Sequence, residues 1–207
     1  MEQSPTITQP TAIQEAVQPT ELSLQQQAFV LQQRQAKAIA ASDLTPPLFR
    51  GKIANVLIAM NLAARTNLDV LTIMQETYIV QNRPSFSSKF LITLINTSGK
   101  FTPLRFQYIG NPQDDTWGCY AYATDISTGE KLKGTTVTIA MAKAEGWTSK
   151  SGSKWKTMPE QMLAYRAAAF FQRLYAPELT AGGLTTEERQ DIATQATDEA
   201  SNPIDEL

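Results

Sequence analysis

Residues 102–138 constrain the fold most, because their side-chain pattern differs from that of the chain on either side. Three runs rich in β-branched and aromatic residues, TPLRFQYIG, WGCYAYAT and KLKGTTVTI, follow one another here. Turn-forming residues separate them, first at 111–115 and then at 125–130. The pattern predicts a three-stranded antiparallel meander.

The first of these runs indicates how the meander packs. Phe106 and Tyr108 alternate with Arg105 and Gln107, and successive side chains of a strand point to opposite faces. One face of the meander is therefore expected to pack on helices while the other stays polar.

Helical periodicity surrounds the meander. The sequence predicts a glutamine-rich amphipathic helix at about 22–41, a core helix at about 48–66, a short helical segment near 68–75, a strand at 78–80, a turn at 82–84 and a helix at about 87–97. A short helix follows the meander, and a longer one ends before Pro177. The predicted fold class is α+β, with the meander packed against several helices.

The chain is expected to form one domain with flexible ends. Its 207 residues, of which 42% are hydrophobic, suffice for one sizeable core. Residues 1–21 contain three prolines and few large apolar side chains, so they are expected to be disordered. Residues 22–177 are expected to form the single core, and residues 178–207 a short helix followed by an acidic tail.

Composition excludes most catalytic chemistry. The chain has no histidine, which removes histidine bases, activated Ser/His or Cys/His nucleophiles and His-ligated metals. Its one cysteine, Cys119, allows no intrachain disulfide and is expected to be packed in a strand. No secretory signal or membrane-spanning run is recognisable, which favours a cytoplasmic protein. We expect no enzyme activity, no metal and no cofactor.

The net charge of −2 hides a strong asymmetry along the chain. Residues 34–173 carry 17 Lys and Arg against 9 Asp and Glu, a surplus of eight positive charges. Residues 1–33 carry three acids and no cation, and residues 174–207 carry eight acids and one arginine. A basic body with acidic ends is typical of a protein that binds nucleic acid.

The stretch from Gly146 to Pro177 begins with a candidate binding loop. Lys150, Lys154 and Lys156 surround Trp155 in a polar segment. Lysines can hold phosphates and an exposed ring can stack on a base, so this loop suits a single strand of nucleic acid.

The helix that follows the loop carries Arg166 and Arg173, seven residues apart. Seven residues are almost two turns, so both guanidinium groups are expected on one outward stripe. The core-facing side is predicted to carry Leu163, Ala167, Phe170, Phe171 and Leu174, and the wetter side to carry Gln161, Tyr165 and Gln172. Replacing both arginines with alanine is expected to reduce DNA binding and leave the thermal melt nearly unchanged.

Ordinary surface chemistry is the alternative interpretation of these cations. Two arginines on a solvated helix face and three lysines in a loop need no ligand. Two pairs of acids, Asp114 with Asp115 and Glu187 with Glu188, could in principle hold Mg²⁺, but a turn and a helix start explain them better. The spacing required of a phosphate-binding loop is absent, which argues against nucleotide hydrolysis.

Longer stretches of the chain resemble a known family. The segments TYIVQNRPSFSSKFLITLINTSGKF, WGCYAYATDISTGEK, AKAEGW with SKWKTMPEQML, and YRAAAFFQRLYAPEL together resemble a RecT-like phage single-strand annealing protein over about residues 45–195. The resemblance implies an α+β core that binds single-stranded DNA in a positive groove, forms rings or helical filaments, and pairs complementary strands without ATP.

The resemblance also implies roles for particular residues. Lys154, Trp155 and Lys156 match the family's tryptophan region before the last core helix, and Arg166 and Arg173 match basic residues on that helix. Arg83 falls in a turn where family members have a basic residue before proline. The expected nucleic-acid-binding set is Arg83, Lys150, Lys154, Trp155, Lys156, Tyr165, Arg166 and Arg173.

The leading functional hypothesis is therefore annealing of single-stranded DNA in phage-type recombination in a bacterial host cell. The expected partners are single-stranded DNA, further copies of the chain, and a phage exonuclease or a host single-strand-binding protein; no membrane is expected. One alternative is a single-strand-binding or replication-accessory protein that protects DNA without pairing it. Another is an assembly factor that uses the glutamine-rich helix and the acidic tail.

Overall fold

The computed structural model describes residues 21–80, 83–149, 151–180 and 183–189, and has the predicted α+β class. Its elements are α1 (Glu21–Ala40), α2 (Ile53–Thr66), α3 (Val70–Glu76), β1 (Thr77–Val80), β2 (Arg83–Phe86), α4 (Ser88–Thr97), β3 (Arg105–Ile109), β4 (Gly118–Thr124), β5 (Lys131–Lys133), β6 (Val137–Thr138), α5 (Ile139–Ala144), α6 (Lys154–Thr157), α7 (Pro159–Tyr175) and the 3₁₀ turn η1 (Pro177–Leu179). The expected disordered start and acidic tail lie almost wholly outside the described residues.

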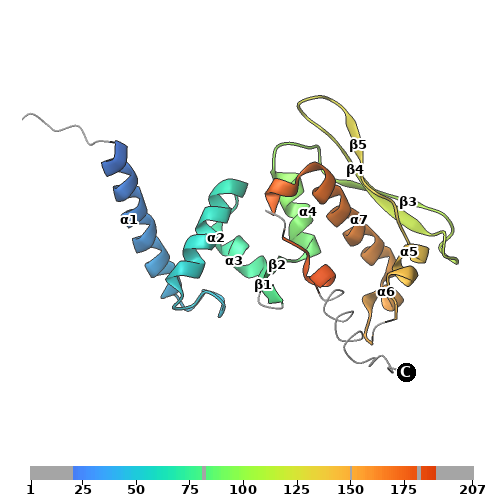
Figure 1. Ribbon diagram of the computed structural model, residues 1–207, viewed down its shortest axis with the longest axis horizontal. Coiled ribbons are helices and arrows are strands. Elements are labelled where there is room, and N and C mark those ends of the chain that lie inside the picture. The colour runs from blue at the N-terminus through green and yellow to red at the C-terminus, as the bar shows by residue number, and fades with distance from the viewer. Residues whose placement is uncertain (1–20, 81–82, 150, 181–182, 190–207) are drawn as a thin grey trace, which may run out of the picture.

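Helix α7 lies between the sheet and α4, so that neighbours cover two of its sides (Figure 1). Ala167, Ala168 and Ala169 in its middle are all buried, and such small side chains let both neighbours approach closely. The rest of the chain places α1, α2 and α3 at the opposite end of the molecule, with the β1–β2 hairpin in between (Figure 1).

Because α7 is buried on two sides, the buried and exposed faces predicted for it are partly wrong. Leu163, Ala167 and Phe171 are buried as expected, but Leu174 is 58% exposed. Gln172, expected on the wetter side, is buried, and its amide donates to the carbonyl of Ala176 at 2.6 Å. A single amphipathic stripe was the wrong pattern for a helix that packs against two partners.

The main sheet has four strands rather than the predicted three. Strands β3, β4 and β5 are antiparallel and adjacent in chain order, and β6 pairs with the beginning of β4. The third predicted run is thus divided in two near Gly134, where α7 passes close to the chain: a Cβ built there would lie 3.2 Å from Cβ of Phe171. Glycine permits this contact because it has no side chain.

A second, two-stranded sheet precedes α4. Strands β1 and β2 pair antiparallel, with Thr77 opposite Phe86 and Val80 opposite Arg83. Arg83, predicted in a turn, is therefore the first residue of a strand. Phe86 also forms an isolated parallel bridge with Thr185, which brings the chain after α7 back to this hairpin.

The N-terminal helices begin and end where the backbone requires it. Helix α2 starts at Ile53, later than predicted, because Gly51 has a φ of +71°, which an α-helix cannot include. The Asp69 carboxylate accepts the backbone N–H of Leu71 at 2.8 Å and so caps α3. None of the described helices is long and apolar enough to cross a membrane by itself. Helices α2 and α3 reach the required length and composition only as a pair, and the pair is bent by 113°.

Cys119 is packed inside the sheet, as predicted. The residue lies on β4 with no exposed surface, and burial raises the pKa of its thiol to about 11. A thiol with so high a pKa stays protonated and unreactive at neutral pH.

Candidate nucleic-acid interface

The two arginines of α7 share one stripe, as predicted, but they do not point into open solvent. Arg166 is only 7% exposed, and its guanidinium Nη1 lies 3.4 Å from Oε1 of Glu188. Arg173, whose side chain is 40% exposed, forms an ion pair with the same carboxylate oxygen. The expected outward position is therefore wrong for Arg166, and although Arg173 is partly exposed, one buried acid lies against both cations.

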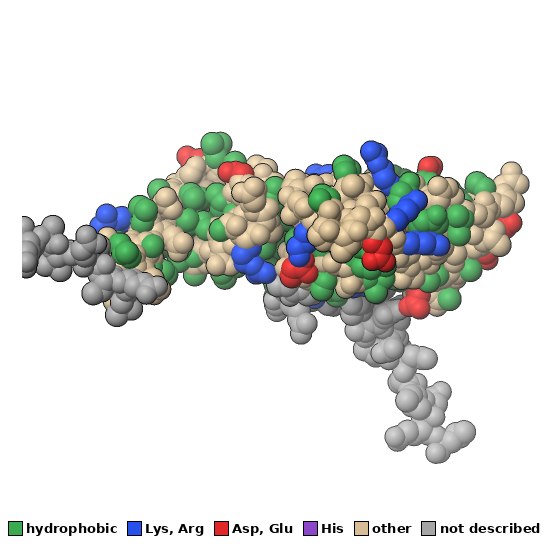
Figure 2. Space-filling view, turned by 90° about the horizontal axis from the view of Figure 1, so that it is seen from above, with side chains coloured by type: hydrophobic (Ala, Val, Ile, Leu, Met, Phe, Trp, Pro, Cys, Tyr) green, Lys and Arg blue, Asp and Glu red, His purple; other side chains and the backbone are tan. Residues whose placement is uncertain are grey.

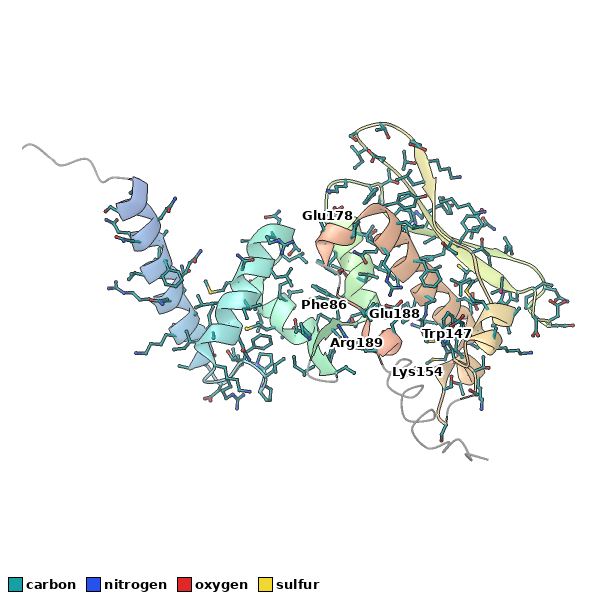
Figure 3. All side chains as sticks on the ribbon, viewed as in Figure 1. Phe86, Trp147, Lys154, Glu178, Glu188 and Arg189 are labelled. Carbon is teal, nitrogen blue, oxygen red and sulfur yellow. The ribbon has the colours of Figure 1, made fainter. Side chains whose placement is uncertain are left out.

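Glu188 is held in place by its own local structure. Residues 186–189 are helical, and Thr185 and Glu188 form a capping box at their start. The N–H of Glu188 donates to Oγ1 of Thr185 at 3.2 Å, and the N–H of Thr185 donates to Oε2 of Glu188 at 3.0 Å. Figure 3 shows Glu188 on the short helical segment between the hairpin and α7. The Thr-x-x-Glu spacing was visible in the sequence, but its tertiary partners were not.

Trp155 is a buried structural residue and not the exposed stacking ring that was predicted. The residue is 4% exposed, and its indole lies 5.2 Å from that of Trp147, centroid to centroid. The guanidinium of Arg166 in turn stacks on Trp147, with its carbon 3.9 Å from the ring centroid. Trp147 from the turn after α5, Trp155 from α6 and Arg166 from α7 thus form one internal stack.

The lysines beside Trp155 do face solvent. Lys154 and Lys156 lie on the one-turn helix α6, which Ser153 caps, and both are exposed. Neither forms an ion pair with any residue that the structure describes. Both lysines precede Pro159, the first residue of α7, whereas Arg173 lies in the last turn, about 21 Å from Pro159 along the helix axis.

The other predicted residues are distributed as follows. Tyr165 is half-buried, and its hydroxyl accepts a hydrogen bond from Nε2 of Gln161 at 2.6 Å. Arg83 lies on β2, and Lys150 lies outside the described residues. The structure thus brings Trp155 and Arg166 together through Trp147, and leaves Lys154, Lys156 and Arg173 at separate ends of α7.

Both acid pairs have the structural roles that the sequence indicated. Asp114 accepts the N–H of Thr116 at 2.8 Å within its turn, and hydrogen bonds from Thr116 hold the pKa of Asp114 below its usual value. Asp115 forms an ion pair with Lys143 at 2.5 Å. Glu187 accepts a hydrogen bond from the hydroxyl of Ser88 at 3.0 Å.

The exposed face of the sheet carries basic and aromatic side chains that were not proposed together from the sequence. Lys131 and Lys133 on β5 lie over the rings of Tyr122 and Tyr120 on β4, with Nζ 4.5 Å and 4.1 Å from the ring centroids. Arg105 on β3 is opposite Tyr122. The alternation of the three runs could have placed these residues on one face, since Arg105 and Gln107 were already assigned to the polar side.

The fold and the charge together define the class of protein: an α+β core with a surplus of cations, whose described residues contain no cluster of side chains that could hold a metal ion. The sequence matches the RecT family over residues 30–203, so the chain belongs to the RecT family of single-strand annealing proteins, which bind DNA and act in recombination. Comparisons with curated proteins and with solved structures found no match.

Proposed function

We propose that this protein binds single-stranded DNA and anneals complementary strands in phage-type homologous recombination, without hydrolysing a nucleotide. The observation that carries the proposal is the cationic surplus on a body of the RecT family: 17 Lys and Arg against 9 Asp and Glu in residues 34–173. Several of these cations are exposed and form no ion pair with the described residues, so they are available to phosphates.

Annealing needs only binding energy. Lysines and arginines that hold the phosphates release counterions from the strand, which gives affinity that falls as salt rises. A strand held by its backbone leaves its bases free to pair with a complementary strand, and pairing itself supplies the free energy. No group that activates water or a nucleotide is required.

Among the residues expected to touch DNA, those at the surface are the proposed contacts: Lys154 and Lys156 on α6, the exposed edge of Arg173, and Tyr165, with Arg83 and Lys150 added by the resemblance. Trp155 and Arg166 support this surface from within, through their stack with Trp147. We place the activity in the bacterial cytoplasm, beside a phage exonuclease or a host single-strand-binding protein.

A mixing experiment tests the proposal. Two complementary oligonucleotides, labelled with a donor and an acceptor dye, are mixed with and without the protein at low salt and without ATP. The protein is expected to speed duplex formation, and the double variant Lys154→Gln/Lys156→Gln to lower that gain by about tenfold, because two phosphate contacts are lost. A protein that slows duplex formation would be a protector of single strands, and annealing would then be wrong.

We further propose that copies of the chain assemble through α1. The N-terminal part of this helix extends beyond α2 (Figure 1), and Leu24, Phe29, Val30 and Leu31 are between 44% and 56% exposed. Among the α1 side chains that the structure describes, residues 23–40, only Ala36 and Ala40 near the C-terminal end are buried. So many exposed apolar side chains on one helix fit the surface of a neighbouring copy, in a ring or a filament.

Sedimentation velocity tests this assembly. Leu24 and Leu31 are seven residues apart, on one side of α1, so Leu24→Ser/Leu31→Ser is expected to convert oligomers into monomers at concentrations where the unchanged protein assembles. Ile126→Ser removes an equally exposed apolar side chain from the turn after β4 and is the control. Assembly that survives the double variant would contradict the role of α1.

A further inference from the structure

The sheet presents a face that no described helix covers. Cys119, Ala121 and Ala123 of β4 are buried toward α7, so the alternating residues Tyr120 and Tyr122 point to the opposite side. In Figure 1 the sheet lies at the outer edge of the molecule, with α7 on its inner side. The outward face is therefore a surface and not part of the core.

The strand register gathers three cations around the two tyrosines. Tyr122 of β4 lies between two of them, because it pairs with Arg105 on the neighbouring strand β3 and with Lys133 on the other neighbouring strand, β5. Two strand spacings separate Arg105 from Lys133, which is about 10 Å. Lys131 is opposite Thr124, one pleat further along the same face. Arg105, Lys131 and Lys133 are exposed, and none forms an ion pair with the described residues.

The acidic residues nearest to this face in the sequence either accept hydrogen bonds within a turn or lie outside the strands that form the face. Asp125 follows β4, and its carboxylate accepts the N–H of Ser127 at 2.8 Å inside the turn. Hydrogen bonds from Ser127 and Thr128 hold the pKa of Asp125 below its usual value. Glu130 precedes β5 and is not one of its strand residues. The strand residues of the face carry positive charge and no negative charge, and in Figure 2 Lys and Arg side chains gather over this part of the molecule.

The tyrosine rings are placed for stacking as well. Their centroids lie 6.1 Å apart, and both rings are only partly buried. Each ring holds a lysine ammonium over its face, which keeps the cation near the ring without neutralising it. Aromatic side chains on an antiparallel sheet with cations beside them can bind unpaired bases and the phosphates between them together.

We propose that this sheet face, made of Arg105, Tyr120, Tyr122, Lys131 and Lys133, is a contact surface for single-stranded nucleic acid. Phosphates lie at the three cations, and one or two bases displace the lysine heads and stack on the tyrosines. The surface is separate from the arginine stripe of α7, because α7 lies behind the sheet. The inference rests on the proposed function, since it gives the single strand a second contact surface in addition to the one proposed at α6 and α7.

Fluorescence anisotropy with a labelled oligo-dT, which cannot pair with itself, tests the surface. Lys131→Gln/Lys133→Gln is expected to weaken binding at low salt by about tenfold and to reduce the dependence of log affinity on log salt by about 1.4, for two lost phosphate contacts. Tyr120→Leu/Tyr122→Leu is expected to weaken binding by about tenfold with the salt dependence unchanged.

The matched control is Lys37→Gln/Lys52→Gln. It removes the same charge from exposed lysines on α1 and before α2, at the far end of the molecule (Figure 1), and is expected to bind oligo-dT almost as the unchanged protein does. Far-ultraviolet circular dichroism is used to check that each variant is folded. If Lys131→Gln/Lys133→Gln binds as tightly as the unchanged protein, or no more weakly than the control, the sheet face is not a contact surface. That result would not contradict DNA binding by the protein as a whole. If the unchanged protein does not bind oligo-dT, the proposed function fails as well.

Discussion

Replacing Glu188 with glutamine is expected to lower the free energy of unfolding by about 3 kcal/mol, because it removes the carboxylate that a buried arginine faces. Arg166 is 7% exposed and Arg173 shares the same oxygen, so the change affects two cations at once. For a chain of this size the melting temperature should fall by roughly 10 °C. Thermal unfolding followed by circular dichroism measures the effect.

The neighbouring residue supplies the control for this prediction. Glu187→Gln removes the same charge one residue earlier, where the carboxylate accepts hydrogen bonds from Ser88 and Thr186 and faces no described cation, and it should cost about 1 kcal/mol or less. Adding Arg166→Met to Glu188→Gln should recover part of the loss, because the buried cation is then gone. Equal melting temperatures for the two glutamine variants would show that the buried ion pair contributes nothing.

This result would also revise the expectation drawn from the sequence for Arg166. An outward arginine could be replaced by alanine with little effect on the melt. A buried arginine that stacks on Trp147 and faces Glu188 cannot. Reduced DNA binding in an Arg166 variant is therefore evidence about a contact only if the variant melts like the unchanged protein.

Replacing Phe171 with alanine is expected to cost about 4 kcal/mol, because it opens a cavity between α7 and the sheet. The ring is fully buried, packs edge-on against Phe101 at 5.6 Å, and lies where α7 approaches Gly134. A cavity at this point removes support from behind β4 and β5. Guanidinium unfolding measures the loss, and the slope of the transition shows whether the native state has remained compact.

The matched control is the same substitution at Phe170, a less buried position of the same helix. It is the preceding residue of α7 and is only half-buried, so Phe170→Ala should cost about 1 kcal/mol. If the two phenylalanine variants lose the same stability, Phe171 does not anchor α7 to the sheet. The comparison holds chemistry and helix position nearly constant and changes mainly the depth of burial; Phe170 also has the guanidinium carbon of Arg173 5.8 Å from its ring centroid.

Much of the fold could be predicted because it depends on local pattern. The strand-like runs, the helix predicted at 87–97, which Ser87 caps, and the turn at 111–115 all follow from side chains near one another in the chain. The division of the third strand at Gly134 could not be predicted in the same way. It depends on Phe171, which is distant in sequence and near only in the folded chain.

The same distinction between local pattern and tertiary contact applies to the candidate site. By itself the sequence determined the cationic surplus, the absence of histidine chemistry and the seven-residue spacing of the α7 arginines, because these are properties of composition and helical period. Only the tertiary structure decided which cations are available. It placed Glu188 against both arginines, buried Trp155 beside Trp147, and brought residues of three strands onto one open face. A charge that another residue of the folded chain neutralises or buries is less available to DNA, and that depends on contacts between residues far apart in sequence.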